Sequence, residues 1–314
     1  MQEQDFVKLA YQAAFGTDFT FPNNTEAWQK IFDATPAADK PLFEIISPDY
    51  CRINIAAWKH RNLKAAWLFN MFKSSVKSLP DSEEIFNQYI KDITNKRTIH
   101  LSGAMEHSEI YKQLYSPSYC IVSTRFLQVI PILYKLANTP PNKPYIIVID
   151  GRAASGKTTF SKQLAMITGT DTIHMDDFFL PVEMRTAQRM SEPGGNVHYE
   201  RFKTEVIPNL RKSVPFAYQC FDCSKMQLGK MRTLSGTPWK IIEGAYSMHP
   251  TFGNYADLKI FYDISPEEQI KRIRIRNGDK KAAVFTSKWI PLEEKYISTF
   301  NIRKQADIVI GNRD

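Results

Sequence analysis

The sequence predicts an α/β fold over residues 141–314, in which helices cover both faces of a parallel sheet, and a mostly α-helical domain over residues 1–140. Short runs of β-branched and aromatic residues alternate with helical patterns in the second half, as in parallel βαβ units. Apolar residues recur at helical spacing through the first half. A chain of 314 residues is also long for one hydrophobic core, which favours two domains.

A glycine-rich loop is the most specific feature of the second half. The predicted strand YIIVID at 145–150 leads directly into GRAASGKT at 151–158, which matches G-x-x-x-x-G-K-[ST] at every specified position. Glycines in such a loop let backbone N–H groups converge on phosphate oxygens, and the following helix turns its positive end toward the anion. The predicted nucleotide-binding residues are therefore Gly151, Arg152, Ala153, Ala154, Ser155, Gly156, Lys157, Thr158 and Thr159.

Two residues of this loop have specific expected roles. Lys157 should reach the β- and γ-phosphates of a nucleotide, and Thr158 should supply a hydroxyl ligand to magnesium. The predicted cofactors are ATP and Mg²⁺. An ordinary glycine turn is the alternative, but the amphipathic helix that opens after the loop favours a phosphate site, with apolar positions at Phe160, Leu164 and Ile167.

Two further predicted strands end in acidic residues. DTIHMDDFFLP at 171–181 contains Asp176 and Asp177, and WKIIEGAYSM at 239–248 contains Glu243. Ligands of open α/β sheets bind at such strand ends. One aspartate can take a proton from a substrate hydroxyl while the other contacts the substrate or helps to hold Mg²⁺. Glu243 can orient Mg²⁺ or its water, or contact the acceptor. Solvated loop aspartates are the alternative.

The segment MRTAQRMSEPGGNVHYERF predicts an acceptor pocket. It places several polar and aromatic side chains soon after the strand that ends at Asp176 and Asp177, on either side of a predicted hinge at Gly194–Gly195. The alternative is a set of surface arginines paired with neighbouring glutamates. The residues predicted to bind substrate here are Arg185, His198, Tyr199 and Arg201.

A cationic helix follows the next predicted strand. PEEQIKRIRIRNGDKK begins with proline and acidic residues, and it ends with six cations within eleven residues. Cations near a helix C-terminus are mildly favourable by themselves, but this number exceeds what a cap needs. Arg272 and Arg276 lie four residues apart and share one helix face. They are the candidates for a mobile lid that closes on the transferred phosphate.

Features of the first half and of the cysteines have less specific interpretations. His107, Glu109, Tyr111 and Tyr115 fall within two helical turns and form either a ligand or partner site or, as we prefer, a tyrosine-rich packing face. Trp28, Trp58 and Trp67 are expected in the core rather than on a contact surface.

The single C-x-x-C at Cys220 and Cys223 favours small core or hairpin thiols over a metal or redox site.

Charge is divided unevenly along the chain. Lys and Arg outnumber Asp and Glu by 15 to 14 in residues 1–140 and by 26 to 19 in residues 141–314. The excess of positive charge lies in the half that contains the phosphate loop. A polyanionic substrate explains it without a nucleic acid, since no basic run is interleaved with aromatic residues.

We expect no membrane partner and a cytoplasmic location, because neither a signal peptide nor a membrane-spanning run is recognised. Self-association stays open.

Six segments of the second half carry a family resemblance. GRAASGKTT, MDDFFLP, EPGGNVHYERF, IIEGAYSMHP, PEEQIKRIRIRNG and ADIVIGN occur in the order and at the spacing of the uridine kinase-like proteins, over residues 145–312. These belong to the P-loop kinase group with phosphoribulokinase and type I pantothenate kinase. The resemblance implies a P-loop NTPase-type fold and ATP–Mg²⁺ phosphotransfer to a hydroxyl of a small metabolite. It implies that Asp176 is the catalytic base, that Glu243 is the strand-end glutamate and that Arg272 and Arg276 are the lid arginines.

One departure from the family pattern bears on the acceptor. Uridine kinases usually carry an aspartate that binds the ribose hydroxyls, and His198 stands in its place. A nucleoside such as uridine or cytidine is the first expectation, with pantothenate, a sugar phosphate or a vitamin-like alcohol as alternatives. A third alternative is a non-catalytic ATP-dependent switch. Asp176 argues against the switch, because a sensor needs no base at the acceptor position.

Overall fold

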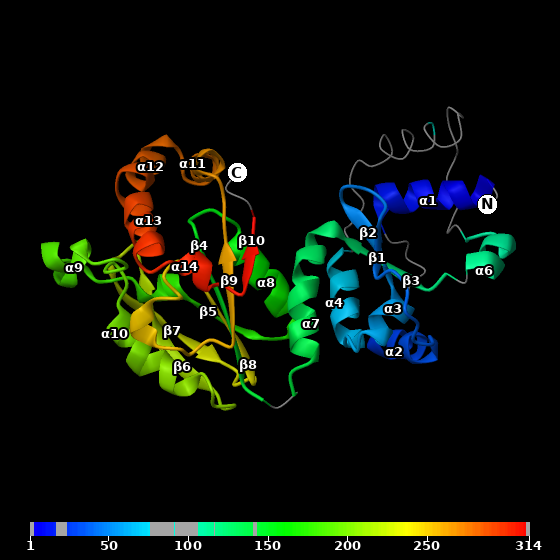
Figure 1. Cartoon of the computed structure of the whole chain (residues 1–314), viewed down its shortest axis with the longest axis horizontal. Helices are drawn as coiled ribbons and strands as arrows, with labels where there is room; N and C mark the ends of the chain where they lie inside the picture. Colours follow the sequence, from blue (N-terminus) through cyan, green and yellow to red (C-terminus); the bar gives the residue numbers. More distant parts are fainter. Residues whose placement is uncertain are drawn as a thin grey trace. The chain divides into compact units, whose positions relative to one another are not determined.

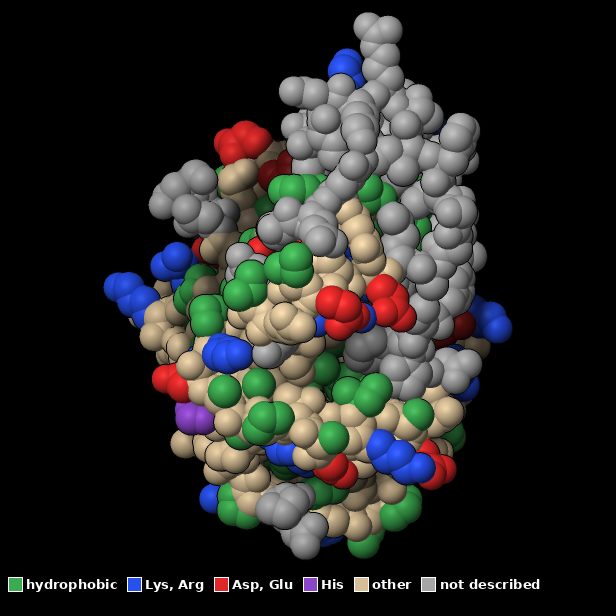
Figure 2. All heavy atoms as spheres, turned by 90° about the vertical axis from the view of Figure 1, so that its right-hand side faces the viewer, with side chains coloured by type: hydrophobic (Ala, Val, Ile, Leu, Met, Phe, Trp, Pro, Cys, Tyr) green, Lys and Arg blue, Asp and Glu red, His purple; other side chains and the backbone are tan. Residues whose placement is uncertain are grey.

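The computed structural model describes residues 3–16, 24–75, 91, 106–115, 117–140 and 143–311 (Figure 1). The chain divides into two compact units, Met1–Asn138 and Thr139–Asp314. No helix within the described ranges is both long and apolar enough to cross a bilayer. On the face shown in Figure 2, Lys and Arg side chains lie singly among acidic and neutral ones where the atoms are coloured.

Unit 1 combines helices with a small antiparallel sheet of order β1-β2-β3. All three predicted tryptophans are confirmed as core residues: Trp28 and Trp58 are fully buried and Trp67 is 3% exposed. The elements are α1 (Glu3–Phe15), α2 (Thr25–Ala34), β1 (Phe43–Ile45), β2 (Tyr50–Asn54), α3 (Ile55–His60), α4 (Ala65–Ser75), α6 (Glu109–Tyr115), β3 (Tyr119–Ser123), the 3-10 helix η1 (Thr124–Val129) and α7 (Ile130–Ala137).

This sheet was not predicted from the sequence, because the apolar spacing of INIAAWKHRNLKAAWLFNMFKSSV indicates helix from Ile53 onward. The central residues of β2 are buried without alternation, so the strand carries no period-2 signal. Asn54 then ends the strand and caps α3, because its side chain accepts a hydrogen bond from the N–H of Ala57 at 2.9 Å. The helical pattern therefore begins two residues later than its apolar spacing suggests.

Unit 2 is built on a five-stranded sheet of order β10-β9-β4-β8-β5, in which every neighbouring pair is parallel. This confirms the predicted P-loop NTPase-type parallel sheet. Strand β4 lies at the centre, so its carboxyl end opens between β8 and β9. The strands are β4 (Tyr145–Gly151), β5 (Asp171–His174), β8 (Trp239–Glu243), β9 (Leu258–Tyr262) and β10 (Ile308–Ile310).

Helical segments flank this sheet and carry most of the site. The longer helices are α8 (Lys157–Thr168), α11 (Pro266–Asn277) and α13 (Ile290–Thr299), with shorter ones at α9 (Ala187–Ser191), α10 (Tyr199–Arg201), α12 (Asp279–Val284) and α14 (Ile302–Gln305). The 3-10 and π turns are η2 (Met175–Phe178), η3 (Val182–Met184), η4 (Phe202–Val206), η5 (Ile207–Asn209), η6 (Pro250–Phe252) and η7 (Phe285–Trp289).

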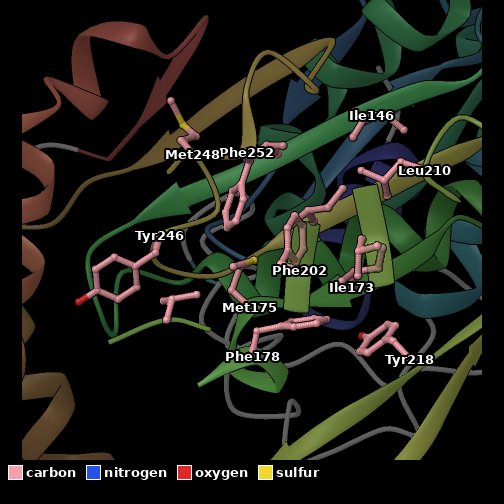
Figure 3. Close-up of a cluster of buried hydrophobic side chains, with 14 of the residues drawn as sticks. Ile146, Ile173, Met175, Phe178, Phe202, Leu210, Tyr218, Tyr246, Met248 and Phe252 are labelled. Atoms are coloured by element: carbon pink, nitrogen blue, oxygen red, sulfur yellow. The ribbon is translucent and has the colours of Figure 1, made fainter. Parts of the chain in front are cut away.

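The two faces of β4 pack against different segments, because successive side chains of a strand point to opposite faces. Ile146 and Val148 belong to a buried cluster that Figure 3 shows, together with Phe202 and other side chains from the segments after β5 and β8. On the other face α8 packs against β4, β5 and β8, and its Phe160 ring lies 5.2 Å from the ring of Tyr262. The central strand is thus fixed from both sides, and with it the start of the phosphate loop.

An antiparallel hairpin stands beside the sheet, formed by β6 (Phe216–Asp222) and β7 (Gln227–Leu234). The alternation of residue types in FAYQCFDCSKMQLGKMRTLSG predicts this hairpin with a turn near Gly229, but Gly229 lies within β7. The turn begins at Asp222, whose Oδ1 accepts hydrogen bonds from the N–H and the hydroxyl of Ser224. Met226 completes it with a φ of 54°.

Candidate active site

The phosphate loop begins at the carboxyl end of the central strand, where two glycines are required. Gly151 has a φ of 135°, and a Cβ on it would lie 2.1 Å from the carbonyl oxygen of Tyr262. Gly156 precedes α8 with a φ of 113°, a backbone conformation that other residues rarely adopt. These conformations turn the chain back over the end of the sheet. The free N–H groups of the first turn of α8 complete a cradle for an anion.

Lys157 closes this cradle. Its side chain is buried, and Nζ donates to the carbonyl oxygens of Gly151 and Arg152 at 2.7 Å each. The buried hydroxyl of Ser155 lines the same pocket and has no hydrogen-bond partner among the described residues. A fixed cation beside an unsatisfied donor fits the phosphates of a nucleotide.

Arg152 differs from the other loop residues, because its side chain is already bound. The guanidinium is 2% exposed, pairs with both carboxylate oxygens of Glu294 and also contacts the buried carboxylate of Asp263. It braces the loop against α13 and the end of β9. Its backbone is therefore the part that is available to a nucleotide, in keeping with the expected role of the loop N–H groups.

Asp150, which the sequence analysis overlooked, anchors the segment behind the loop. It is 1% exposed and accepts hydrogen bonds from the N–H of Tyr246, the N–H of Met248 and the hydroxyl of Tyr296, at 2.7 to 3.2 Å. Burial raises the pKa of this carboxyl. Its place as the last residue of an apolar run, directly before the loop, was the available signal.

A hydroxyl and a carboxylate meet at the start of α8. Thr158 Oγ1 lies 3.2 Å from Glu243 Oε2, and Glu243 Oε1 lies 2.5 Å from His174 Nδ1. Glu243 is 4% exposed and belongs to the pocket lining. Oxygen ligands of this kind suit Mg²⁺, which keeps several waters and binds few protein groups. His174 was missed, although it stands at a strand end two residues before Asp176.

The two adjacent aspartates face different surroundings. Asp176 is exposed into the pocket, while Asp177 is buried and accepts a hydrogen bond from the Tyr218 hydroxyl at 2.8 Å. Arg232 Nε also lies 3.3 Å from Asp177 Oδ2. Desolvation within the pocket and then the charge of Glu243 raise the pKa of Asp176 above its ordinary value. Asp177 thus ties η2 to the hairpin, and the substrate contact that was expected of it stays a prediction.

Both predicted lid arginines line the pocket from α11. Arg272 Nε donates to Glu268 at 2.8 Å, and its NH1 lies 3.5 Å from the carbonyl oxygens of Ala154 and Ser155. Arg276 Nε donates to the side chain of the neighbouring Asn277 at 2.8 Å. Two cations thus stand at the mouth of the phosphate cradle.

The opposite wall of the pocket contains one of the four residues that were predicted as an acceptor site. Arg185 lines it, and its Nε donates to the carbonyl oxygen of Leu180 at 2.8 Å. Asn196, which the sequence analysis overlooked, is 4% exposed there, and its Oδ1 has no hydrogen-bond partner among the described residues. Its position directly after the Gly194–Gly195 hinge was the available signal. Exposed Cys223 and half-buried Phe179 complete this wall.

The other three predicted acceptor residues lie outside the pocket lining. His198 contacts Glu200 at 3.1 Å, the Tyr199 hydroxyl donates to Glu192, and Arg201 pairs with Glu205. The alternative interpretation was a set of surface arginines paired with Glu192 or Glu200, and one such pair is present, between Arg189 and Glu200 at 2.7 Å. Contact with an acceptor requires these pairs to open, so substrate binding by His198, Tyr199 and Arg201 stays a prediction.

One pocket of about 700 Å³ is therefore lined by the phosphate loop, by Asp176 and Glu243, and by both predicted lid arginines. Its volume lies within the range of sites for small ligands. Phe285 and Trp289 of η7 add an aromatic wall. The chemistry available in this space is a cradle for an anion, a hydroxyl and a carboxylate that suit a hard cation, and the separate carboxylate of Asp176.

Comparison with known proteins gives structural matches only. No protein-family model matches the chain, and no curated protein sequence does. A possible uridine kinase from Bacillus stearothermophilus is 20% identical, with a TM-score of 0.46, over 60% of this chain and 100% of that one. A protein from Silicibacter sp. TM1040, named for fructose transport system kinase activity, is 18% identical, with a TM-score of 0.48, over 60% and 99%.

A third structure, deoxyadenosine kinase from M. mycoides, is 16% identical, with a TM-score of 0.25, over 53% of this chain and 89% of that one. Identities of 16 to 20% leave the acceptor undefined. The reaction is therefore inferred from the site residues themselves.

Proposed function

We propose that this chain is a P-loop kinase that transfers the γ-phosphate of ATP to a hydroxyl of a small metabolite, with a nucleoside such as uridine or cytidine as the first candidate. The observation that carries the proposal is the shared pocket, which Lys157, Thr158, Asp176, Glu243 and both lid arginines line. Phosphotransfer needs each of these groups, whereas nucleotide sensing needs only the loop.

Lys157, the loop N–H groups and the lid bind and polarise the phosphates. Burial of Lys157 strengthens its attraction for an anion, because fewer water molecules screen the charge. Arg272 already reaches the carbonyl oxygens of the loop, so a small movement of α11 brings its guanidinium onto the γ-phosphate. These donors stabilise the negative charge that spreads over the equatorial oxygens during transfer.

Asp176 acts on the acceptor. Its carboxylate takes the hydroxyl proton while the acceptor oxygen bonds to the γ-phosphorus and the bond to the β–γ bridging oxygen breaks, which releases ADP. Its pKa is raised, first by desolvation and then by the charge of Glu243, and a raised pKa makes this carboxylate a stronger base than an ordinary aspartate. The burial of Asp177 against Tyr218 and Arg232 keeps the second carboxylate out of this step.

Thr158 and Glu243 would hold Mg²⁺, either directly or through its water. A bound Mg²⁺ would neutralise phosphate charge and orient the β- and γ-phosphates. Within the described ranges no three His, Cys, Asp or Glu side chains form a ready metal cluster. That donor set agrees with a cation that arrives with its nucleotide and retains most of its waters.

A second class of acceptor is favoured by Arg185 and Asn196. Arg185 offers a guanidinium to the pocket, and the unpaired Oδ1 of Asn196 offers an acceptor for an N–H or O–H of the substrate. An anionic compound such as pantothenate or a sugar phosphate would use both. The same phosphotransfer residues serve either class.

The test is ATP consumption by the purified chain with Mg²⁺ across nucleosides, pantothenate and sugar phosphates. We expect one class to stimulate ADP formation and Asp176→Asn to abolish the stimulation. A response to an anionic compound that Arg185→Ala removes would assign the second class. ATP binding without stimulation by any hydroxyl compound would favour the non-catalytic switch.

A further inference from the structure

A buried carboxyl group of α13 occupies one donor of the phosphate loop. The N–H of Ala153 donates to Glu293 Oε2 at 2.8 Å and to Oε1 at 3.0 Å. Glu293 is 4% exposed and lines the same pocket as Lys157. An anion thus lies on the loop that is built to receive the anionic end of a nucleotide.

Gln269 of α11 fixes this carboxyl in place. Its Nε2 donates to Glu293 Oε2 at 3.3 Å and to the carbonyl oxygen of Ala153 at 3.2 Å. One amide therefore links the lid helix, the loop and α13. Glu293 cannot leave the loop without breaking these bonds, so we expect it to remain there when a nucleotide binds.

The charges around Glu293 are mixed. Lys157 attracts its carboxylate, whereas Asp150 at the end of β4 and Glu294 on the same helix repel it. The positive charge of Arg152 offsets little of this repulsion, because its guanidinium pairs with Asp263 and Glu294. The Tyr246 hydroxyl from the loop after β8 also faces the carboxylate, and Tyr246 is itself neutral, with its pKa raised chiefly by burial.

Burial has the largest effect on the pKa of Glu293 and sets the direction of its shift. It raises the pKa of Glu293 to about 7, against the lowering effects of Lys157 and of the Ala153 hydrogen bond. A phosphate beside this carboxylate would repel it, and burial strengthens that repulsion because little water screens the two charges. Neutralising the carboxyl removes that repulsion and keeps one oxygen for the Ala153 N–H.

We propose that Glu293 is a positioning residue of the phosphate loop that takes one proton from solvent when ATP binds. The proposal rests on the proposed function only in that ATP is the ligand. The proton adds to the carboxylate to give a neutral carboxylic acid, and no other bond changes. Ala153 stays anchored, and the pocket loses one negative charge as the triphosphate enters.

The sign of the pH dependence follows from this linkage. Bound ATP raises the pKa of Glu293 above its value in the free protein, so ATP affinity is greatest below pH 7 and falls as pH rises above it. The fall approaches roughly tenfold per pH unit until the pKa of the bound state is passed.

Isothermal titration calorimetry at pH 7.5 in buffers of different ionisation enthalpy measures the protons taken up with ATP. We expect uptake in the wild-type chain and its loss in Glu293→Gln, whose amide can still accept from Ala153. Glu267→Gln is the matched control, because it removes an exposed carboxylate from α11 and should keep the uptake. Equal uptake in Glu293→Gln and the wild type would overturn the proposal.

Infrared difference spectra of the wild-type chain give a second readout that needs no variant. ATP binding should add a protonated-carboxyl band, and its absence would contradict the proposal even if Glu293→Gln failed to fold. If ATP were not the ligand of this loop, the result would look different, because ATP would then not bind at any pH; loss of acceptor stimulation alone would overturn the proposed kinase activity and leave the role of Glu293 intact. ATP that binds with a flat pH profile would remove only the role of Glu293.

Discussion

The hydroxyl of Thr158 lies 3.2 Å from Glu243 Oε2, although the two residues are 85 positions apart. Parallel pairing of β4 with β8 sets Ile149 opposite Glu243, so the strand-end acid lies beside the turn into α8. The sheet therefore fixes the spacing of the two groups that are proposed to hold Mg²⁺.

Removing this hydroxyl should weaken the response to Mg²⁺. Thr158→Ala is expected to raise the Mg²⁺ concentration for half-maximal activity at least about tenfold, because Glu243 alone cannot replace the lost oxygen. Thr158→Ser keeps the hydroxyl and is the control. Mg²⁺ titrations at saturating ATP measure the effect, and identical curves for both variants would exclude Thr158 as a ligand.

Lys157→Ala should weaken nucleotide binding and turnover together. The buried ammonium lies on the loop itself, so its loss should lower kcat/KM for ATP by roughly 100-fold or more. Lys162→Ala removes an exposed cation five residues further along α8 and should leave both quantities near wild type. Unchanged kinetics in Lys157→Ala would reject the phosphate-loop assignment.

Asp176→Asn should lower turnover by roughly 100- to 10,000-fold and leave ATP binding largely intact. Because the pKa of Asp176 is raised, the wild-type rate should also fall with acidification at a higher pH than an ordinary aspartate would give. Steady-state rates across a pH series, with ATP affinity measured separately, check both points. Loss of ATP binding in Asp176→Asn would indicate a metal anchor or a structural role.

Arg272→Ala and Arg276→Ala should each reduce kcat by roughly 100-fold, because both side chains line the pocket mouth. Arg274→Ala is the control: this arginine lies on the same helix and pairs with Asp279 at 2.9 Å. Rapid-quench measurement of the transfer step separates this effect from product release. Equal losses in all three variants would point to the charge of the helix rather than to a lid.

Acid should destabilise unit 1 through His107. Burial lowers the pKa of this histidine to about 4, and its Nε2 lies 2.5 Å from the Tyr119 hydroxyl. The unfolded chain then binds a proton below pH 6.5 that the folded chain does not. Stability should therefore be constant above pH 6.5 and fall by about 2 kcal/mol by roughly pH 5.

Hydrogen exchange of β2 and β3 amides in the full chain measures that loss. His107→Gln should be less stable at neutral pH but should lack the fall between pH 6.5 and 5. The same pH dependence in this variant would assign the effect to another group. His107 lies within the polar cluster that the sequence analysis interpreted as a packing face, and its burial among Asp5, Tyr111 and Tyr119 fits that interpretation.

The parallel sheet and the loop could be predicted from the sequence because their signals are local. A glycine with a positive φ, an apolar strand and an amphipathic helix occur within one short segment around Gly156. The sheet of unit 1 could not, because β2 is buried on both faces and therefore lacks alternation. A local sequence pattern does not identify a strand whose formation depends on tertiary packing.

The sequence also could not predict which side chains pair with one another across the fold. Arg152 is drawn away from the pocket by Glu294, 142 residues later, and Glu293 reaches Ala153 from the same helix. Glu192, Glu200 and Glu205 likewise hold the predicted acceptor residues, through a hydrogen bond from Tyr199 and through contacts with His198 and Arg201. Spacing along the chain gives residue types near a site, but only the three-dimensional neighbours decide which side chains face it.

The most direct test of phosphotransfer is ³¹P NMR of the purified chain with ATP, Mg²⁺ and the acceptor that stimulates ADP formation. We predict a new phosphomonoester signal that grows in equal amount with ADP and is absent for Asp176→Asn. Inorganic phosphate as the sole product, at the same rate with and without acceptor and in both proteins, would contradict the assignment as a small-molecule kinase.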